Sequence, residues 1–467
     1  MQENSTIVTI ADFYASRLAN YRSIYVYLPP GYKQEDRAVR YPVLYMHAGQ
    51  RAFPSIRPGG DSWHVDEACD RLIAEGRIER IIVVAIGHVR PVEGNEFYHF
   101  KAPEEEADRI RCSGVDYEHF IVHELKPYID RRFNTMTDAG HTALMGASAG
   151  ALSSYHIGFR YPDVFGKLIL LSPYFIKASL DAESPSGLRE EKLYQDYPGR
   201  GPGRIWMDIG DAEGLFLPEH ARAAAERLLG QGYRHREELA FLLQPDAAHE
   251  ETAWAQRVEM PLLYMFGKPS RPAALELHGR MEVGIKGPRV RLNPLIRYEN
   301  GLLMTVLRGD FHSERPDVLD IREDGTLVPR QEGEAWIHVQ AEGLHASSRY
   351  TVVAELSELV SVTLTAEVPP AFSQADAIFG GMGMKLSAIG GSRYSGRFLV
   401  PRDSGYQFRF TQGFRRFELD ADGNRVPNRR IRADQELDLH FTIERFAVNK
   451  SNETGRGMDG DGAISST

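Results

Sequence analysis

Strand-like and helix-like segments alternate along residues 1 to about 275, and this order constrains the fold more than any other feature of the sequence. The runs Ile81–Ile86 and Lys167–Leu171 are short and apolar, which is typical of buried strands. Tyr117–Phe133 carries apolar residues at helical spacing. Strands separated by helices predict an α/β fold with a mostly parallel sheet covered on both faces. The remaining expected elements are strands over 22–28, 42–46, 142–145, 204–209 and 238–244, and helices over 66–75, 151–160, 218–229 and 252–266.

The pattern becomes all β after about residue 275, with short alternating segments and turn signals such as Asp324-Gly325. We therefore expect an α/β domain over 1–275 and two small β-sandwich domains over 276–356 and 357–447. Residues 448–467 are rich in Gly, Asp and Ser and predict a disordered tail. The polar segment Lys177–Gly203 is too long for a simple connection and predicts a lid or excursion.

Composition excludes several classes of protein. The length of 467 residues fits about three domains. A net charge of −10 argues against a nucleic-acid or anionic-membrane partner. Cys69 and Cys112 are too few for a disulfide scaffold or a multi-cysteine zinc site, and free buried thiols are the favoured interpretation over a pair. No apolar run has membrane-spanning length and no signal peptide is visible, so we expect a cytoplasmic protein, or a secreted one if Met1 is not the natural start.

The segment Gly146-Ala147-Ser148-Ala149-Gly150 fits the pattern G-x-S-x-G between a predicted strand and a predicted helix. A sharp strand-to-helix turn crowds the backbone, so glycines are needed on both sides of the serine. The turn would lift the Ser148 hydroxyl clear of the sheet, at a helix N-terminus that favours developing negative charge. The pattern predicts Ser148 as a nucleophile; the alternative is a glycine-rich turn with a capping serine.

A serine nucleophile needs a base, and the base needs an acid that orients it. In α/β folds that carry a nucleophilic serine at such a turn, the chain order is Ser, then Asp or Glu, then His. The loop after the strand 204–209 offers two carboxylates, Asp211 and Glu213, at a strand C-terminus where open α/β sheets place their sites. His249 ends the loop after the strand 238–244 and is the predicted base; the alternative is a surface loop histidine.

The oxyanion of the tetrahedral intermediate needs two hydrogen-bond donors. The backbone N–H of Ala149, directly after the nucleophile, is one candidate. The second should come from the loop after an earlier strand, where Gly49 permits close backbone approach and the N–H of Gln50 follows. The alternative is an ordinary turn at the end of that strand.

These residues resemble the putative-esterase family of α/β-hydrolases, which includes enterochelin and feruloyl esterases, S-formylglutathione hydrolase and mycolyltransferases. The similar segments, spread over about residues 7–270, are 26–32 (VYLPPGY), 41–50 (YPVLYMHAGQ), 124–130 (ELKPYID) and 145–150 (MGASAG). The resemblance implies Ser148 as nucleophile, His249 as base, and Gln50 and Ala149 as oxyanion donors. It implies Glu213 as the acid, with Asp211 as the fallback, and a reaction that needs no metal or cofactor.

The chain departs from the family pattern at small residues near the oxyanion loop. The family often has Asp or Gly where Ala48 stands, and often Met-Gly-Gly at 149–151. These departures bear on substrate preference more than on catalysis. Residues 280–355 resemble a bacterial Ig-like module, and 359–447 resemble a starch-binding β-sandwich, although the latter segment contains no Trp on which a sugar could stack.

The sequence therefore predicts a serine esterase that cuts a siderophore, aryl or carbohydrate-linked ester through an acyl-enzyme. Trp63, Arg90 and Tyr98 are expected to line the substrate pocket together with the 177–203 excursion, although ordinary packing explains them equally well. Two alternatives stay open: an acyltransferase with the same residues, and a glycan- or partner-binding protein with a non-catalytic hydrolase scaffold. The C-terminal modules could also mediate oligomer formation.

Overall fold

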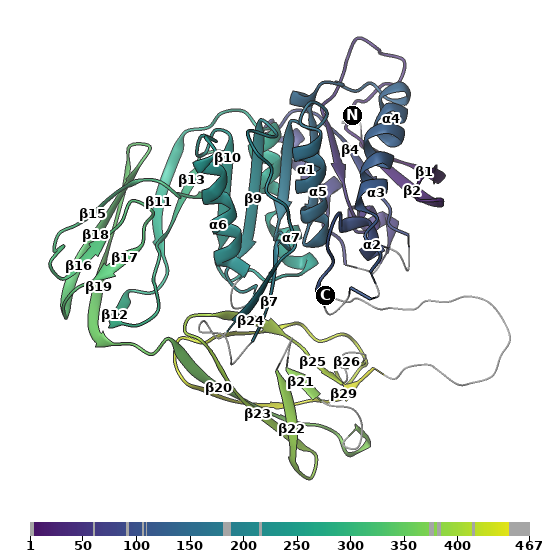
Figure 1. The fold of residues 1–467 in the computed structure, drawn as a ribbon. Coiled ribbons are helices and arrows are strands. Elements are labelled where there is room, and N and C mark those ends of the chain that lie inside the picture. The colour runs from purple at the N-terminus through teal and green to yellow at the C-terminus, as the bar shows by residue number, and fades with distance from the viewer. Residues whose placement is uncertain are drawn as a thin grey trace. The chain divides into compact units, whose positions relative to one another are not determined.

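The computed structural model describes residues 4–58, 61–89, 93–104, 107–108, 110–180, 188–213, 217–372, 378–380, 384–412 and 416–447 (Figure 1). The chain divides into two compact units. The first comprises Met1–Asp211, Phe216–Ile285 and Arg289–Ala354, and the second comprises Ala212–Leu215, Lys286–Pro288 and Glu355–Thr467. The predicted tail 448–467 and Arg90 lie outside the described residues.

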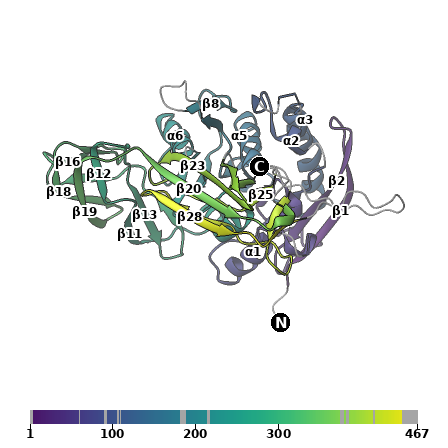
Figure 2. The ribbon, with the colours of Figure 1, turned by 90° about the horizontal axis from the view of Figure 1, so that it is seen from below.

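The first unit is built on a central sheet, which in the described chain has eight strands in the order β1-β2-β4-β3-β5-β6-β9-β10. From β4 to β10 all neighbouring strands are parallel, whereas β1 and β2 join the edge antiparallel. Figure 2 shows β1 and β2 side by side at one side of the first unit. The α/β-hydrolase prediction is thereby confirmed. The strands are β1 (Thr6–Ala15), β2 (Asn20–Leu28), β3 (Val43–Met46), β4 (Ile82–Ile86), β5 (Thr142–Ala147), β6 (Lys167–Leu171), β9 (Arg204–Gly210) and β10 (Leu239–Gln244).

Helices cover both faces of this sheet, so two hydrophobic clusters form, one on each side. Helices α1, α7 and α8 contribute to one cluster, and α3 to α6 to the other. The helices are α1 (Val65–Ala74), α2 (Glu93–Phe97), α3 (Gly114–His119), a π-helix η4 (Phe120–Leu125), α4 (Lys126–Arg132), α5 (Ala149–Arg160), α6 (Leu217–Gly230), α7 (Glu251–Arg257) and α8 (Glu259–Phe266), with short 3₁₀ turns η1 (Gly49–Arg51), η2 (Pro54–Ile56) and η5 (Ala139–His141). Within the described chain, none of the helices is both long and apolar enough to cross a membrane.

Prolines explain two differences from the predicted helices. The helix expected over 252–266 is two helices, because Pro261 has no N–H to donate to the carbonyl of Arg257. The helix expected over 117–133 contains the π-helical segment immediately before Pro127, where the N–H of Lys126 reaches back to the carbonyl of Ile121. The edge strand β1 was not predicted at all.

The polar excursion 177–203 contains part of an antiparallel β hairpin, formed by β7 (Ile176–Leu180) and β8 (Leu188–Lys192). The described residues of the hairpin pair along their whole length, from Ile176 opposite Lys192 to Leu180 opposite Leu188. The excursion is therefore an ordered projection at these positions rather than an irregular loop.

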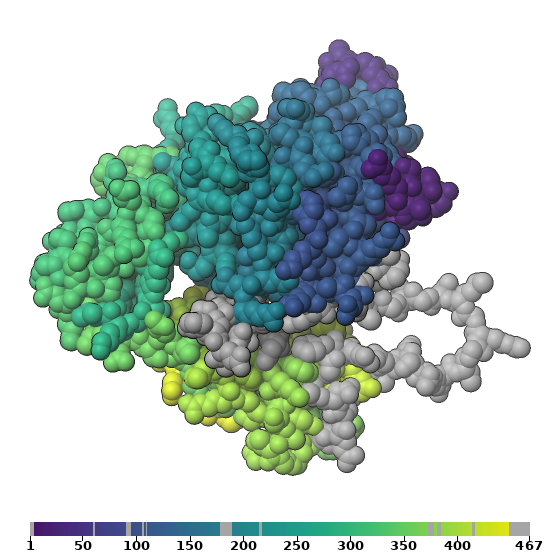
Figure 3. Space-filling view, in the orientation of Figure 1, coloured from purple at the N-terminus to yellow at the C-terminus, as the bar shows by residue number. Residues whose placement is uncertain are grey.

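The β strands between residues 272 and 355 share a hydrophobic core with the α/β part of the first unit. Figure 3 shows the surface of these strands, in green, directly beside that of the α/β part, in teal. Leu275, Ile296 and Val339 belong to the same hydrophobic cluster as Trp206 and Leu262. The predicted boundary at 275/276 falls inside the first of these strands. They are β11 (Pro272–His278), β12 (Glu282–Lys286), β13 (Asn293–Tyr298), β14 (Leu303–Thr305), β15 (Asp310–Ser313), β16 (Leu319–Ile321), β17 (Leu327–Pro329), β18 (Gly333–Ala341) and β19 (Leu344–Glu355).

Polar contacts fix the same interface within the first unit. The buried Arg222 guanidinium donates to the carbonyl oxygens of Leu292 at 2.9 Å and Asp324 at 3.2 Å. The side chain of Asn293 donates to the carbonyl of Leu243 at 2.9 Å. Burial lowers the pKa of Arg222 to about 10, and the nearby Arg291 acts in the same direction.

The described residues of the second unit form β strands and one short 3₁₀ turn, with a hydrophobic cluster of their own that includes Val362, Leu364 and Phe410. Its larger sheet has the order β28-β20-β23-β22-β21-β25-β26-β29, and β20 pairs antiparallel with β23 but parallel with β28. The elements are β20 (Leu359–Glu367), η6 (Pro370–Phe372), β21 (Ile378–Gly380), β22 (Lys385–Gly390), β23 (Arg393–Pro401), β24 (Gly405–Phe408), β25 (Phe410–Gln412), β26 (Arg416–Leu419), β27 (Arg429–Arg432), β28 (Leu437–Thr442) and β29 (Arg445–Phe446). The domain limits and the Ig-like and starch-binding-like assignments stay predictions.

Candidate active site

The loops that carry the predicted catalytic residues leave the central sheet at one edge. β3, β5, β9 and β10 run parallel within the sheet, so their carboxyl ends point the same way. Ligand sites of open α/β sheets form at this edge. Gln50 follows β3, Ser148 follows β5, Asp211 begins the loop after β9, and His249 ends the loop after β10. The topology therefore directs these four segments toward a common region.

Ser148 stands at a strained turn between β5 and α5, with φ 54° and ψ −125°. A residue with a side chain rarely adopts a positive φ, and such strain is concentrated at functional sites. The turn has no room for a side chain at Gly146, because a Cβ there would lie 2.3 Å from the carbonyl oxygen of Gly150. The backbone N–H of Ser148 donates to the carbonyl of Leu171 at 3.0 Å. The sharp turn predicted from the sequence is present.

Two helix N-termini supply the predicted oxyanion donors. Ala149 is the first residue of α5, and Gln50 is the second residue of the 3₁₀ turn η1. The first N–H groups of a helix have no acceptor within the helix, so both can serve another group. Ala48, with φ 54° and ψ 43°, turns the chain into η1. A Cβ on Gly49 would lie 2.4 Å from the backbone of Ala85, so a glycine is required where this loop crosses β4.

The side chain of Gln50 holds this loop against the segment after β4. Its Oε1 accepts a hydrogen bond from the backbone N–H of His88 at 3.2 Å, and its Nε2 also contacts the His88 ring. The amide side chain is engaged in these contacts, so the expected contribution of Gln50 to an oxyanion is its backbone N–H.

His249 is half-buried and packs edge-on against Trp254 of α7, with ring centroids 5.1 Å apart at 77°. Trp254 in turn contacts Trp63 at a centroid distance of 5.3 Å and donates its indole N–H to Ser172 Oγ at 2.8 Å. An indole fixed from two sides presents a rigid surface to the imidazole ring. The structure therefore brings Trp63, predicted to bind substrate, to the surroundings of His249.

The loops after β9 and β10 are bound to each other. A Cβ on Gly210 would lie 2.0 Å from the carbonyl oxygen of Ala247, so the two backbones are in contact there. The N–H of Asp211 donates to the carbonyl of Gln244 at 3.0 Å, and the Asp211 carboxylate accepts the N–H of Asp246 at 2.7 Å. Asp211 thus ties the loop that ends in His249 to the end of β9. Glu213, two residues further along the chain, is buried.

A buried ion pair joins Arg257, the last residue of α7, to Asp208 of β9. It was not predicted from the sequence. Arg257 Nε donates to Asp208 Oδ1 at 2.9 Å, with both side chains almost completely buried. Arg257 also donates to Ser172 Oγ at 2.6 Å, and Asp208 accepts the indole N–H of Trp206 at 2.7 Å. Buried charges are retained where they are paired and hydrogen-bonded. A signal existed, since Asp208 is a carboxylate inside an apolar strand.

His47 lies immediately before the oxyanion loop and is fully buried. Burial lowers the pKa of His47 to about 3, with His99 acting in the same direction. Its Nδ1 lies 2.9 Å from the hydroxyl of Tyr117. The imidazole is therefore neutral at physiological pH and serves as a packing and hydrogen-bonding group beside Gly150, where a Cβ on the glycine would lie 3.9 Å from its ring atom Cδ2.

The first half of the chain is similar to known esterases. The model of the Putative esterase family matches residues 15–259. The chain belongs to this family. It is 27% identical over 254 residues to an endo-1,4-beta-xylanase/feruloyl esterase of Xylanibacter ruminicola, a match that covers 53% of this chain and 30% of that protein. The chain thus spans under a third of the length of this relative.

Two solved esterases are similar in fold to this family member. One is described as a ferulic acid esterase, with 22% identity, a TM-score of 0.41, and coverage of 56% of this chain and 98% of that chain. The other is the enterobactin esterase of Shigella flexneri solved with enterobactin, with 16% identity, a TM-score of 0.40, and coverage of 56% and 58%. The family match confirms the expected class, a carboxylic ester hydrolase domain, over the first half of the chain.

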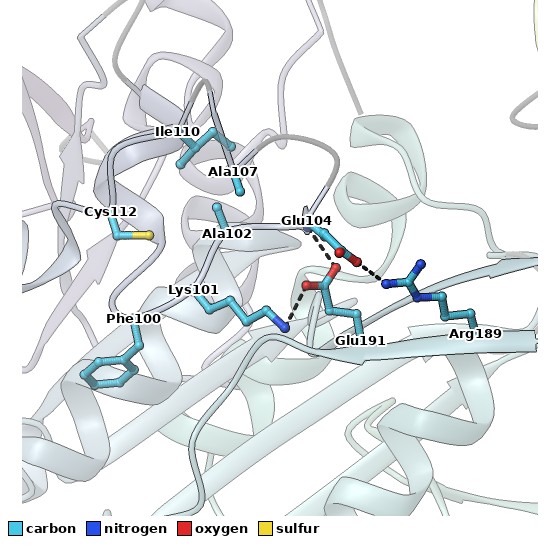
Figure 4. Close-up of a pocket in the computed structure, with 9 residues that line it drawn as sticks. All are labelled: Phe100, Lys101, Ala102, Glu104, Ala107, Ile110, Cys112, Arg189 and Glu191. Atoms are coloured by element: carbon cyan, nitrogen blue, oxygen red, sulfur yellow. Dashed lines mark hydrogen bonds and ion pairs between the residues drawn. The ribbon is translucent and has the colours of Figure 1, made fainter.

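A cavity of about 530 Å³ in this esterase domain lies between the segment 100–112 and strand β8 of the excursion (Figure 4). Its apolar lining includes Phe100, Ala102, Ala107, Ile110 and Cys112. Charged pairs cross its rim: Lys101 lies 2.8 Å from Glu191, and Arg189 contacts Glu104. The 177–203 excursion, which the sequence analysis expected to line the substrate pocket, contributes Arg189 and Glu191 to this cavity, although none of the predicted catalytic residues is among its lining residues.

The predicted substrate-binding residues do not lie together in one site. Trp63 and Tyr98 are both almost fully buried, and they belong to hydrophobic clusters on opposite faces of the sheet. Arg90 lies outside the described residues. The structure thus brings Trp63 close to His249 through Trp254 and places Tyr98 in the packing between the helices of the other face. Cys69 and Cys112 are both unpaired.

Proposed function

We propose that this member of the Putative esterase family is a serine esterase with Ser148 as nucleophile and His249 as base. The observation that carries the proposal is the strained backbone of Ser148 at the β5–α5 turn, directly before the N-terminus of α5. A capping serine in an ordinary turn needs no positive φ, and in this structure Ser148 makes no side-chain capping bond to α5. The strain is what the geometry of a nucleophile elbow requires.

The reaction follows from these positions. His249 accepts the proton of Ser148 as Oγ attacks the ester carbonyl, and the N–H groups of Gln50 and Ala149 stabilise the oxyanion. Collapse of the tetrahedral intermediate breaks the C–O bond, and the protonated His249 delivers its proton to the leaving alcohol. Water, deprotonated by His249, then attacks the acyl-enzyme and releases the carboxylic acid and free Ser148.

We propose Glu213 as the acid that orients His249. Glu213 stands at the last position of the pattern Gly-x-x-Asp/Glu, which carries the acid in similar esterases and starts here at Gly210. The carboxylate of Asp211 already accepts the N–H of Asp246, a structural task that supports the choice of Glu213. We expect Glu213→Gln to reduce kcat by about 10⁴ through the wrong tautomer of His249, and Asp211→Asn to act mainly on stability. If Asp211→Asn instead lowered kcat by that factor and Glu213→Gln did not, Asp211 would be the acid.

We further propose an aryl ester, of the hydroxycinnamoyl type, as the substrate. The support comes from the relative named endo-1,4-beta-xylanase/feruloyl esterase, to which this chain is 27% identical over 254 residues. The cavity between residues 100–112 and β8 has an apolar lining and a charged rim, which suits a planar ring with polar substituents. In such an ester the alcohol would be supplied by a carbohydrate.

The test is hydrolysis of p-nitrophenyl esters from acetate to long acyl chains, with methyl ferulate beside them. Wild-type protein should hydrolyse these esters, and Ser148→Ala should lose about 10⁶ of kcat. Faster hydrolysis of methyl ferulate than of aliphatic esters would support the aryl assignment. Equal activity in Ser148→Ala would overturn the nucleophile, and an aliphatic preference would overturn the substrate class.

A further inference from the structure

An ion pair connects the two loops that the proposed mechanism needs to hold in register. Arg51 is the last residue of η1, directly after Gln50, and Glu251 is the first residue of α7, two residues after His249. Arg51 Nη1 contacts Glu251 Oε1. The two side chains are 26% and 18% exposed, so the contact is partly withdrawn from water. The two residues are 200 positions apart in the sequence. Their contact joins the turn that contains Gln50, the proposed oxyanion donor, to the helix that follows His249, the proposed base.

The backbone around Arg51 is bound on its other side as well. The carbonyl of Arg51 accepts the N–H of Trp63 at 2.8 Å and the hydroxyl of Ser62 at 3.3 Å. Trp63 contacts Trp254, which contacts His249. Two sets of contacts therefore join η1 to the loop that contains His249. One is the ion pair of Arg51 and Glu251, and the other is the packing of Trp63 on Trp254 and of Trp254 on His249.

Such a link matters more to this reaction than its free energy suggests. The two groups must act on one carbonyl centre, so the distance between the Gln50 N–H and the His249 imidazole has to match the tetrahedral intermediate. A partly exposed ion pair adds little to global stability. It does restrict the relative movement of the two short segments on which the donor and the base stand.

We propose that Arg51 and Glu251 are positioning residues for ester hydrolysis, which set the spacing between the oxyanion turn and the catalytic base. The proposal rests on the proposed function, because Gln50 and His249 have their roles only there. Neither residue contacts the substrate in this account. Because they position groups that act on the transition state, loss of the pair should lower kcat and leave KM nearly unchanged.

The experiment compares Arg51→Gln, Glu251→Gln and the double variant with wild-type protein on one p-nitrophenyl ester. Each single variant should lose about tenfold or more in kcat, since a misplacement of about 1 Å can cost about a hundredfold. The double variant should lose no more than either single one, because both changes remove the same contact. Arg51→Lys, which keeps the charge, should recover part of the loss.

A second ion pair between the neighbouring helices provides the matched control. Arg71 of α1 contacts Glu259 of α8 and is itself 56% exposed. Arg71→Gln removes a salt bridge between the same two regions of the chain but away from η1, and should leave kcat unchanged. Thermal unfolding of all variants should shift by no more than about 2 °C, which separates positioning from loss of structure.

Two failures are distinguishable. If wild-type and Ser148→Ala proteins are equally unable to hydrolyse esters or react with a fluorophosphonate probe, the proposed function fails and the positioning role with it. If Ser148→Ala alone is inactive while Arg51→Gln and Glu251→Gln keep kcat within about threefold of wild type, the positioning role alone is overturned. Additive losses in the double variant, or a loss confined to KM, would overturn it too.

Discussion

His235 should make the first unit sensitive to acid. Its ring is half-buried, its Nε2 accepts the N–H of Leu307 at 3.2 Å and lies 3.3 Å from the carbonyl oxygen of Thr305, and its Nδ1 makes no hydrogen bond within the described chain. Burial lowers the pKa of His235 to about 4, and the neighbouring Arg236 acts in the same direction. A proton on Nε2 would remove the acceptor of the Leu307 N–H and place a positive charge beside that guanidinium. The Thr305 carbonyl oxygen favours the charged ring, but burial and Arg236 outweigh it.

The size of the effect follows from the difference between the folded pKa of about 4 and the ordinary value of 6.5. Between these two values the unfolded chain binds a proton at this site and the folded chain does not, so stability falls as the pH falls through 6.5 toward 4. Integration from pH 7 to pH 5 gives a loss of about 2 kcal/mol in the free energy of unfolding from this one residue.

Tryptophan fluorescence during urea unfolding measures this quantity in the right part of the molecule. All four tryptophans, at 63, 206, 254 and 336, belong to the first unit. His235→Gln is the comparison, because its amide oxygen can still accept the Leu307 N–H but does not titrate. Wild type should lose about 2 kcal/mol more than the variant between pH 7 and pH 5. Equal losses in the two proteins would refute the reasoning.

Three further predictions concern the elbow, the buried ion pair and the thiols. Gly146→Ala places a Cβ 2.3 Å from the Gly150 carbonyl oxygen and should abolish ester hydrolysis. In Gly150→Ala the new Cβ meets its nearest atom at 3.5 Å, so this variant should lose far less activity. Similar activities in the two variants would contradict the steric argument. Arg257→Met leaves the Asp208 carboxylate without its guanidinium and should lower the free energy of unfolding by about 3–5 kcal/mol in the same fluorescence assay, and a loss below about 1 kcal/mol would argue against a buried pair. Burial raises the pKa of the Cys69 thiol, so a disulfide reagent at pH 8 should label Cys69 only after urea is added; labelling in the native protein would show that the thiol is accessible.

The sequence was most informative where local chemistry decides the structure. The alternation of apolar runs and helical periodicities predicted the parallel sheet, because buried strands and amphipathic helices differ in period. The glycine on either side of Ser148 predicted the sharp turn, since the need for Gly146 is steric and local. Strand β1 was missed because all of its residues but one are exposed or half-buried and they show no strong alternation.

Contacts between distant segments were the part that the sequence could not supply. Asp208 and Arg257 meet across 49 residues, and Arg51 meets Glu251 across 200, with no spacing rule that connects them. Each of these charged residues is common on a protein surface, and only the tertiary fold shows that it is partnered. The Gln50 side chain is a similar case, because its contact with His88 depends on how two loops leave neighbouring strands.

The shared core of the first unit limits how this esterase can be cut or recombined. A chain that ended at residue 275 would break β11 in its middle and remove Ile296 and Val339 from the cluster that they form with Trp206. Arg222 would lose both carbonyl acceptors and become a charge on a newly exposed apolar face. Such a fragment should aggregate, so any attempt to graft this hydrolase onto another protein has its first usable joint near residue 355, where the first compact unit ends.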